Sequence, residues 1–341
     1  MTRPIAITMG DPAGIGPEII AKAFAEAPEL LQGCFVAGDV ECMRRGAALA
    51  AMGRIALPVA AIAASAECPA VPPGCIPVLP VEAGRRPLPP LGRVDPAAGR
   101  AAAQAVQWAA RAALRGEIAA LVTAPLNKEA LAAAGLAFPG HTELLQAEAA
   151  AHRGMTAAQM PVRMMLANRE LRTVLVSIHV SLREAIEAVT FDNVLVTLRI
   201  AHQALSAALG RSPRLGVAGL NPHAGEGGLF GREELEIIAP AIAAARGEGM
   251  DAHGPFAPDT VFMRARTGEF DAVIAMYHDQ GLIPVKYLGV EQGVNVTLGL
   301  PLVRTSPDHG TAFDIAGTGR ASAASLIEAI RVARQLSGSA S

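Results

Sequence analysis

The chain has 341 residues, of which 51% are hydrophobic and 4% aromatic, and its formal net charge is -2 at pH 7. This length suggests roughly two domains, and the apolar fraction is enough for buried cores built mainly from Ala, Val, Leu and Ile. No basic tract and no interleaving of basic and aromatic residues occurs, which argues against a nucleic-acid-binding protein.

Short apolar runs alternate with amphipathic helical stretches, a pattern typical of α/β proteins with largely parallel sheets. The expected strands cover residues 5–8, 34–37, 119–123, 173–179, 215–220 and 272–277. The expected helices cover residues 18–27, 97–115, 127–134, 183–189, 194–209 and 233–246. Ser181 and Glu184 form a capping box before the helix at 183–189. Residues 68–96 are rich in proline and glycine, so we expect an irregular surface segment with short extended pieces.

The most apolar region, residues 47–64, is interrupted by Arg54 and Pro58 and is too short to span a bilayer. The N-terminus leads straight into the first expected strand, without the layout of a signal peptide. The four cysteines match no zinc-binding spacing, and scattered thiols in a chain of this size favour the reduced state over a Cys68–Cys75 disulfide. We therefore expect a soluble, cytoplasmic protein with no membrane partner.

Three histidines share one position in this pattern, because each lies at or just beyond the end of an expected buried strand. They are His179, His223 and His278. Open α/β sheets bind ligands at the carboxyl ends of their strands, and three neutral imidazoles suit a catalytic divalent metal. Their wide separation along the chain forms no metal motif by itself, so three unrelated polar residues are the alternative.

Two glycine-containing segments differ in content. Residues 9–18 match neither a Walker A loop nor a dinucleotide fingerprint, so a structural turn is the simpler interpretation. Residues 308–317 contain small side chains that let a flat ring approach, and Asp314 is suited to accept hydrogen bonds from ribose hydroxyls, the usual preference for NAD. A glycine-punctuated loop before the last helix is the alternative for this second segment.

Several polar side chains indicate an anion site. Lys286, Asn295 and Arg304 interrupt an otherwise apolar stretch, and Arg and Lys near strand ends are suited to hold a phosphate or carboxylate. Each alone is more often a solvated residue. His141 and Thr142 stand at an expected helix start, where free N–H groups favour anions.

Together these segments resemble the 4-hydroxythreonine-4-phosphate dehydrogenase family of vitamin B6 biosynthesis over nearly the whole chain. The matching segments are Gly10–Glu18, Thr123–Pro125 with Lys128, Gly140–Glu143, Asn221–Glu226, Pro258–Thr260, Tyr277–Gly281, Gly293–Asn295 and Arg304–Ser306. Residues 14–18 and 309–317 are also similar to isocitrate and isopropylmalate dehydrogenases, in which the second loop holds the adenosine of the cofactor.

The resemblance implies two α/β/α domains with mostly parallel sheets, as in isocitrate and isopropylmalate dehydrogenases, and an active site in the interdomain cleft. We place a discontinuous cofactor-side domain at residues 1–125 and 295–341, and a metal, substrate and dimerisation domain at residues 126–294. The family further implies a homodimer with shared active sites, in which one metal-binding histidine comes from the neighbouring subunit.

The resemblance also implies residue roles. The implied ligands of one divalent ion per site (zinc, cobalt, manganese or magnesium) are His179, His223 and His278. The implied binders of the phosphorylated substrate are His141, Thr142, Lys286, Asn295 and Arg304. The implied NAD-binding residues are His309, Gly310, Thr311, Ala312 and Asp314. The unranked candidates for the general base are Asp259, Asp279, Lys286 and Lys128.

The implied reaction is NAD-dependent oxidation and decarboxylation of 4-phosphohydroxy-L-threonine to 3-amino-2-oxopropyl phosphate. Residues 123–128 and 179–184 are more similar to the catabolic branch, which converts 4-phospho-D-threonate or 4-phospho-D-erythronate to dihydroxyacetone phosphate. The retained phosphate-binding residues argue against a third branch, which acts on aromatic cis-diol carboxylates. Two other classes are a binding protein without turnover and a phosphate-transfer enzyme, the latter disfavoured because no nucleotide-phosphate loop is present.

Overall fold

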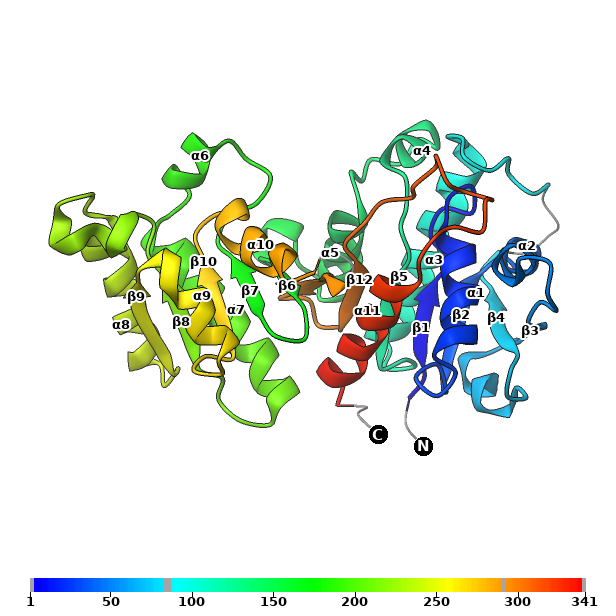
Figure 1. Cartoon of the computed structure of the whole chain (residues 1–341), viewed down its shortest axis with the longest axis horizontal. Coiled ribbons are helices and arrows are strands. Elements are labelled where there is room, and N and C mark those ends of the chain that lie inside the picture. Colours follow the sequence, from blue (N-terminus) through cyan, green and yellow to red (C-terminus); the bar gives the residue numbers. More distant parts are fainter. Residues whose placement is uncertain (1–2, 83–86, 290–291, 339–341) are drawn as a thin grey trace. The chain divides into compact units, whose positions relative to one another are not determined.

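The computed structural model describes residues 3–82, 87–289 and 292–338, and the chain divides into two compact units. Unit 1 comprises Met1–Met160 and Leu300–Ser341, and unit 2 comprises Pro161–Gly299. Each unit is a β-sheet with helices packed against it (Figure 1). The α/β class with mostly parallel sheets is confirmed.

Unit 1 contains a parallel sheet with the strand order β3-β4-β2-β1-β5-β12. Its strands are β1 (Ile5–Thr8), β2 (Cys34–Gly38), β3 (Val59–Ala61), β4 (Ile76–Pro80), β5 (Ala120–Thr123) and β12 (Arg304–Pro307). The chain proceeds from β1 to β2 on one side, whereas β5 pairs with β1 on the other. The strand order therefore reverses beside β1, and such a switch point is where α/β sheets bind ligands.

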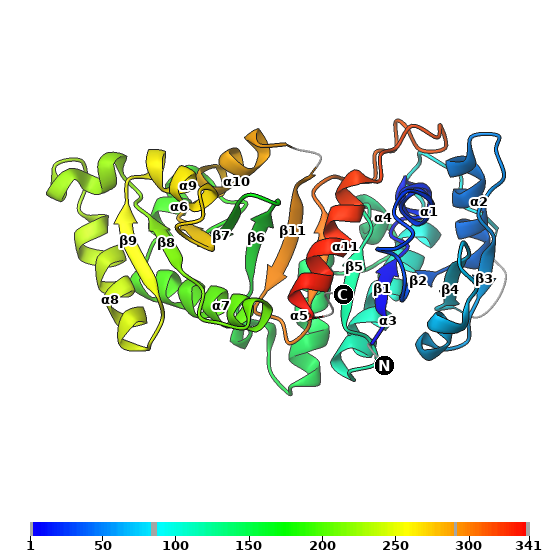
Figure 2. The same cartoon turned by 60° about the horizontal axis from the view of Figure 1, so that its bottom comes forward.

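The helices of unit 1 form two groups, one on each face of the sheet (Figure 2). One group is α1 (Gly16–Glu26), α2 (Val40–Ala51) and α11 (Ala324–Leu336). The other is α3 (Pro96–Leu114), α4 (Lys128–Ala133) and α5 (His141–His152). Two short 3₁₀ helices, Ser65–Ala70 and Ala157–Gln159, complete the unit.

Unit 2 contains a mixed sheet with the strand order β11-β6-β7-β10-β8-β9. Its strands are β6 (Arg163–Ala167), β7 (Arg172–Leu175), β8 (Leu215–Ala218), β9 (Ala252–Phe256), β10 (Ala272–Ala275) and β11 (Val294–Leu298). Strand β6 is antiparallel to both of its neighbours, whereas β7, β10, β8 and β9 are parallel. The carboxyl ends of β7, β10, β8 and β9 therefore share one edge of this sheet, and the carboxyl end of β11 lies at the same edge.

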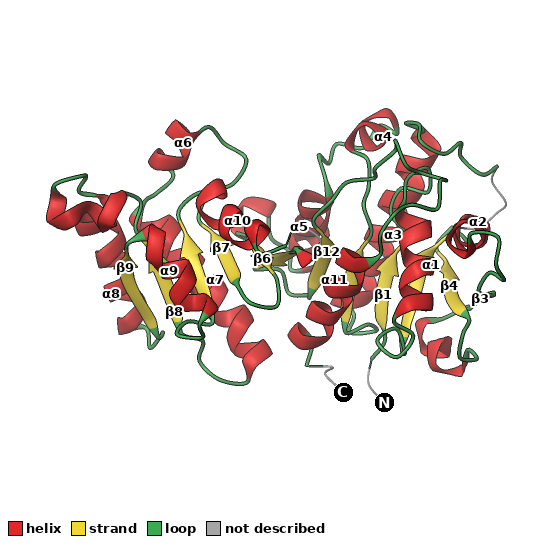
Figure 3. Ribbon diagram, viewed as in Figure 1, coloured by secondary structure: helices red, strands yellow, loops and turns green. Residues whose placement is uncertain are grey.

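The helices of unit 2 also pack in two groups; Figure 3 shows them in red beside the yellow strands. Helices α7 (Phe191–Leu209) and α8 (Ala239–Gly247) contact each other, and α9 (Pro258–Arg266) and α10 (His278–Tyr287) pack on β10. Helix α6 (Leu182–Glu187) begins with the expected capping box of Ser181 and Glu184. A 3₁₀ segment, Pro222–Gly228, and a π-helical turn, Glu234–Ile238, follow β8.

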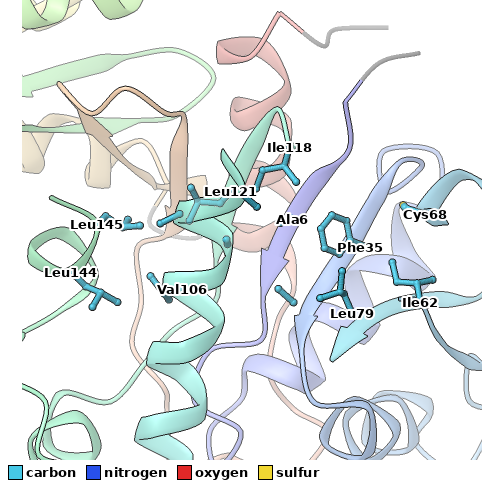
Figure 4. Packing of buried hydrophobic residues seen from close by; sticks show 14 residues of the cluster. Ala6, Phe35, Ile62, Cys68, Leu79, Val106, Ile118, Leu121, Leu144 and Leu145 are labelled. Carbon is cyan, nitrogen blue, oxygen red and sulfur yellow. The ribbon is translucent and has the colours of Figure 1, made fainter. Parts of the chain in front are cut away.

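The core of unit 1 is built around the alanine-rich helix α3. Ala105 and Ala109 are fully buried, and Val106 of the same helix belongs to the cluster that contains Phe35 of β2 and Leu121 of β5 (Figure 4). The ring of Trp108 stands edge-on to Phe35, with centroids 5.8 Å apart and planes at 84°. Small side chains let α3 approach the sheet closely, so this chain fills its core with few aromatic residues.

Two expectations differ from the structure. The stretch 68–96 contains β4, a buried internal strand rather than a surface piece, because Ile76 and Val78 point into the core although Pro77 and Pro80 obscure the pattern. The expected boundary after residue 125 differs from the observed units, because α4 and α5 pack on α3 and so belong to unit 1. Residues 295–299 belong to unit 2 because β11 pairs with β6.

Among the described residues, no helix combines the length and the apolar character needed to cross a membrane. The four cysteines are free thiols. Burial raises the pKa of Cys34 and Cys42 to about 12. Both thiols are therefore protonated and unreactive at neutral pH.

Helix α4 packs so closely on α3 that residue 99 must be glycine. A Cβ on Gly99 would lie 2.2 Å from the backbone oxygen of Ala130, so we expect Gly99→Ala to lower the free energy of unfolding by about 1–3 kcal/mol. Gly247→Ala is the matched control, because no atom lies within 4 Å of its Cβ position. Thermal unfolding should show a lower midpoint for the first variant only; equal midpoints would contradict this packing.

Candidate active site

The three candidate metal ligands follow three neighbouring parallel strands of unit 2. Strands β7, β10 and β8 lie side by side in that order, and His179, His278 and His223 come shortly after their respective carboxyl ends. His278 is the first residue of α10, and His223 lies in the segment Pro222–Gly228. The loops that carry the three histidines therefore start from adjacent positions on one sheet edge.

Two of the three imidazoles lie close together. The ring centroids of His179 and His278 are 5.6 Å apart, and the ring planes are inclined by 45°. A metal–nitrogen bond of about 2.0–2.1 Å places a ring centre about 3 Å from the ion. The observed spacing therefore suits two imidazoles that share one divalent ion.

His223 is not part of this pair. Its ring lies 6.2 Å, centroid to centroid, from the ring of Phe230. Within residues 3–82, 87–289 and 292–338, no three side chains of His, Cys, Asp or Glu are close enough together to hold a metal ion. The structure thus brings together two of the predicted ligands, and the set of three stays a prediction.

Asp279 orients the His278 ring. The Nδ1 atom of His278 lies 2.7 Å from Oδ1 of Asp279, a hydrogen-bond distance. When a carboxylate accepts the Nδ1 proton, the lone pair of the imidazole is fixed on Nε2, where it is available to a metal. A carboxylate behind a ligating histidine is a common arrangement around protein-bound zinc, so the chemistry of this donor set fits a divalent ion.

The backbone of the histidine loops is strained. His179 has a φ of 47°, and His223 has a φ of 51°. The left-handed region continues through residue 227, including Ala224 and Glu226, which are not glycine. Such conformations cost free energy and persist only where the surrounding structure enforces them, as it often does at functional sites. The sequence does not reveal this strain at Ala224 and Glu226, because neither residue type favours a positive φ.

Unit 1 contains a buried cation close to the end of β5. Arg304 of β12 is 4% exposed, and its Nε and Nη2 atoms donate hydrogen bonds to Oγ1 of Thr123 at 3.1 and 2.8 Å. Burial lowers the pKa of Arg304 to about 10, and the carboxylate of Glu143 counteracts the shift. Arg304 stays protonated at neutral pH, so it provides the fixed positive charge that an anionic ligand requires.

His141 lies next to this arginine at the start of α5. Burial and then the charge of Arg304 lower the pKa of His141 well below its ordinary value, although the Ala124 carbonyl accepts a hydrogen bond from the ring. The ring is therefore neutral at pH 7. Its Nε2 atom is inaccessible and has no hydrogen-bond partner among the described residues. An unsatisfied buried nitrogen is costly, and this marks His141 as a candidate ligand-binding group.

The predicted cofactor loop packs against the glycine turn after β1. The N–H of Ile15 donates to the carbonyl of Thr311 at 3.1 Å, and a Cβ on Gly14 would lie 2.9 Å from Thr311. Ala312 has a φ of 43°, whereas His309, Gly310 and Asp314 are exposed in this loop. The segments 9–18 and 308–317 thus form one surface of unit 1.

Glu18 and Lys22 of α1 hold the chain that follows this loop. The ammonium of Lys22 donates to the carbonyls of Gly319 and Ala321 at 2.7 and 2.6 Å, and to Glu18 at 3.0 Å. Oε1 of Glu18, a buried residue, accepts from the N–H of Ala321 at 3.0 Å. The glycine turn therefore anchors the loop and is more than a simple connection.

The other predicted residues occupy varied positions. Half-buried or exposed side chains are found for Lys286 in the last turn of α10, Asn295 in β11, Thr142 in α5, Asp259 in the first turn of α9 and Lys128 at the start of α4. The contacts of Asp259, Lys128 and Lys286 do not favour one of these residues over the others as the general base. Asp279 differs, because its carboxylate is engaged with His278.

Asp11 is a buried acid in the turn after β1, and no sequence motif marks it as functional. It is fully buried, and Oδ1 accepts a hydrogen bond from the N–H of Ala13 at 2.8 Å. Burial raises the pKa of Asp11 to about 6, the Ala13 N–H opposes the shift, and the negative charge of Asp95 adds to it. A buried acid with a raised pKa, in a turn that packs against residues 308–317, is typical of functional sites.

The raised pKa of Asp11 makes a prediction about stability. The folded chain keeps this proton up to about pH 6, whereas a free carboxyl loses it near 3.8, so ionisation reduces stability as pH rises through this window. At pH values above this window, the ionised carboxyl lowers the free energy of unfolding by about 3 kcal/mol. Asp11→Asn should therefore raise the unfolding midpoint, relative to the unsubstituted chain, more at pH 8 than at pH 4.

The control for this comparison is Asp192→Asn, which changes an exposed carboxyl in the first turn of α7. Its effect on the midpoint should be small and nearly the same at both pH values. If the effect of Asp11→Asn were equally independent of pH, the carboxyl of Asp11 would not be destabilised by burial.

Comparison with known proteins shows an extensive match. The family model described as pyridoxal phosphate biosynthetic protein PdxA matches residues 31–333. A 4-hydroxythreonine-4-phosphate dehydrogenase from Beijerinckia indica is 52% identical over 336 residues, which cover 98% of this chain and 96% of the relative. A D-threonate 4-phosphate dehydrogenase from Salmonella typhimurium is 44% identical and covers 98% of this chain and 99% of its own length.

The fold matches as well as the sequence does. The crystal structure of a 4-hydroxythreonine-4-phosphate dehydrogenase from Klebsiella pneumoniae superimposes with a TM-score of 0.88 at 42% identity. The match covers 98% of this chain and 100% of that structure. The resemblance noted from short motifs therefore extends over both compact units.

Proposed function

Because the chain belongs to the PdxA family of pyridoxal phosphate biosynthetic proteins, we propose that it is a dehydrogenase that oxidises a hydroxyl group of a phosphorylated four-carbon acid. The names of its relatives, 4-hydroxythreonine-4-phosphate and D-threonate 4-phosphate dehydrogenase, support this substrate class. The structural observation that carries the proposal is the pairing of His179 with His278 at one sheet edge.

His179, His223 and His278 would hold one divalent ion, with one of the three imidazoles supplied by a partner subunit. When bound, the ion lowers the pKa of the substrate hydroxyl and stabilises the negative charge that develops during decarboxylation. Three imidazole ligands favour a transition metal such as zinc or cobalt over magnesium, although availability also decides which ion is loaded. Asp279 keeps the His278 ring in the tautomer that ligation requires.

The proposed binders of the phosphorylated acid are His141, Thr142, Lys286, Asn295 and Arg304. The buried guanidinium of Arg304 supplies a fixed positive charge, which favours a phosphate or carboxylate. The neutral His141 can accept a hydrogen bond from a substrate hydroxyl or a protonated phosphate. The proton of the substrate hydroxyl would pass to Asp259, Lys286 or Lys128, since Asp279 is engaged with His278.

The cofactor would be NAD, held by the loop residues His309, Gly310, Thr311, Ala312 and Asp314. NAD, when bound, accepts the hydride that leaves the hydroxyl-bearing carbon. The contact of Ile15 with Thr311 and the bonds from Lys22 to residues 319 and 321 keep this loop in place. Asp314 is exposed and is suited to accept hydrogen bonds from ribose hydroxyls.

Exposed apolar side chains support a homodimer in which the sites are shared. Such side chains follow each candidate ligand: Val180, Leu182 and Ile186 after His179; Leu229, Phe230 and Leu235 after His223; Ile283 and Tyr287 after His278. Tyr287 is 90% exposed and Leu229 73%, and a second copy packed on these loops would remove this apolar area from water. A second copy of the chain that covers these apolar side chains would also place an imidazole beside His179 and His278.

The first proposed substrate is 4-phosphohydroxy-L-threonine, converted to 3-amino-2-oxopropyl phosphate. The alternative is 4-phospho-D-threonate or 4-phospho-D-erythronate, converted to dihydroxyacetone phosphate. The relative at 52% identity is named for the first class of substrate and the relative at 44% for the second. Residues 123–128 and 179–184 favour the alternative by their similarity to the catabolic branch.

An activity comparison tests the proposed reaction. Purified protein with NAD and zinc should form NADH with at least one of the three phosphorylated acids, and a chelator should abolish turnover. The kcat/KM of each acid identifies the physiological class, because a site built for the amine discriminates against a hydroxyl in its place. Absence of NADH with all three acids would refute the proposed function.

Removal of one imidazole tests the metal assignment. His223→Ala should lower both metal affinity and turnover by more than about 100-fold, because even partners that only orient ligands contribute about 10–100-fold. His253→Ala is the matched control in the same unit, since His253 is exposed and paired with Asp251 at 2.6 Å. An unchanged metal stoichiometry in His223→Ala, measured by elemental analysis, would reject the assignment.

A further inference from the structure

A chain of hydrogen bonds crosses the three strand ends that carry the histidine loops. The hydroxyl of Ser177, just beyond β7, donates to the carbonyl of Met276 at 3.0 Å. The N–H of Met276, just beyond β10, donates to Oε1 of Gln280 at 2.6 Å. Nε2 of Gln280 donates in turn to the carbonyl of Gly219 at 2.8 Å, just beyond β8. Two buried side chains thus tie β7, β10 and β8 together at the edge from which His179, His278 and His223 extend.

The central link requires an amide side chain. Gln280 is 8% exposed, and it accepts from one strand end while donating to another. A carboxylate has no proton to donate and would repel the Gly219 carbonyl, and an apolar side chain would leave both backbone groups unsatisfied. Because Gln280 lies in the first turn of α10 with His278, it also couples that histidine to the β8 loop.

A third buried side chain, that of Glu234, holds the loop of His223. Oε1 of Glu234 accepts hydrogen bonds from the N–H groups of Leu220 and Asn221, both at 2.7 Å, and Oε2 accepts from Nδ2 of Asn221 at 3.0 Å. Glu234 is 2% exposed. A Cβ on Gly225 would lie 2.7 Å from Oε2 of Glu234. The loop therefore wraps closely around this carboxylate.

The carboxylate of Glu234 is stabilised by the dipoles of backbone and amide N–H groups. Among the described residues its carboxylate forms no ion pair with Lys, Arg or His, and successive backbone N–H groups surround it as they surround a bound anion. This arrangement organises the backbone immediately before residues 223–227, where every φ is positive. The left-handed turn that contains His223 has only a few backbone hydrogen bonds of its own. The hydrogen bonds to the Glu234 carboxylate therefore help to stabilise this turn.

We propose that Gln280 and Glu234 are positioning residues for the metal centre. They touch neither substrate nor ion; they fix the strand ends and the strained turn from which the three imidazoles extend. The inference rests on the proposed metal-dependent function, and it assigns to two buried polar side chains the task of pre-organising the ligands. Ligand pre-organisation lowers the cost of assembling the site when the ion binds.

The test compares metal affinity in two variants and two matched controls. Gln280→Met removes both hydrogen bonds of the amide without changing charge, and Glu234→Gln places an amide N–H₂ against donors. The controls are Gln203→Met, an exposed glutamine on α7, and Glu236→Gln, an exposed carboxylate paired with Arg232 near Glu234. Dissociation constants for zinc and cobalt are measured by competition with a chelator, together with thermal unfolding of the metal-free chains.

Both variants should bind zinc and cobalt about 10–100-fold more weakly than the unsubstituted chain, with an altered visible spectrum of the cobalt form, whereas both controls keep its affinity. Should Glu234→Gln fail to fold, Gln280→Met decides the question alone. Tight metal binding by the unsubstituted chain with unchanged affinity in the folded variants would overturn the positioning role only. No metal binding by the unsubstituted chain would instead reject the proposed metal-dependent function, and the inference with it.

Discussion

Val273 of β10 pairs with Thr173 of β7 on one side and with Gly216 of β8 on the other, and this common parallel register constrains everything proposed for unit 2. Because side chains that leave parallel strands at their carboxyl ends share one edge, the register brings three sequence-distant loops together. The register alone leaves the loops free to diverge. Buried polar contacts from Gln280 and Glu234 then restrict the ends of β10 and β8, and the backbone of the His223 loop adopts a left-handed conformation directly after the residues that Glu234 holds.

The two units supply different chemistry. Unit 2 offers imidazoles, one of them oriented by Asp279, which is the donor set of a Lewis-acid centre. Unit 1 offers the buried positive charge of Arg304 beside a neutral His141, together with an anchored loop after β12. Oxidation of a phosphorylated hydroxy acid needs an anion site, an activated hydroxyl and a place for the hydride acceptor. Each of these has candidate residues in the described structure.

The sequence predicted best what depends on neighbours along the chain. The bounds of β1 and the capping box of α6 followed from local pattern, and the positions of the three histidines after strands followed from apolar runs. The sequence did not predict β4 as an internal strand, because Pro77 and Pro80 obscure its strand-like pattern. Contacts such as Gln280 with Gly219, and the burial that raises the pKa of Asp11, depend on residues that only the fold brings together. No local pattern encodes them.

The most direct test of a metal centre built from these histidines is anomalous diffraction at the zinc edge from crystals of the zinc-loaded protein. We predict a peak at about 2.0–2.1 Å from imidazole nitrogens of His179 and His278, with His223 of one of the two subunits of a dimer as the third ligand. Absence of a peak at these residues, or an ion held by other side chains, would contradict the account.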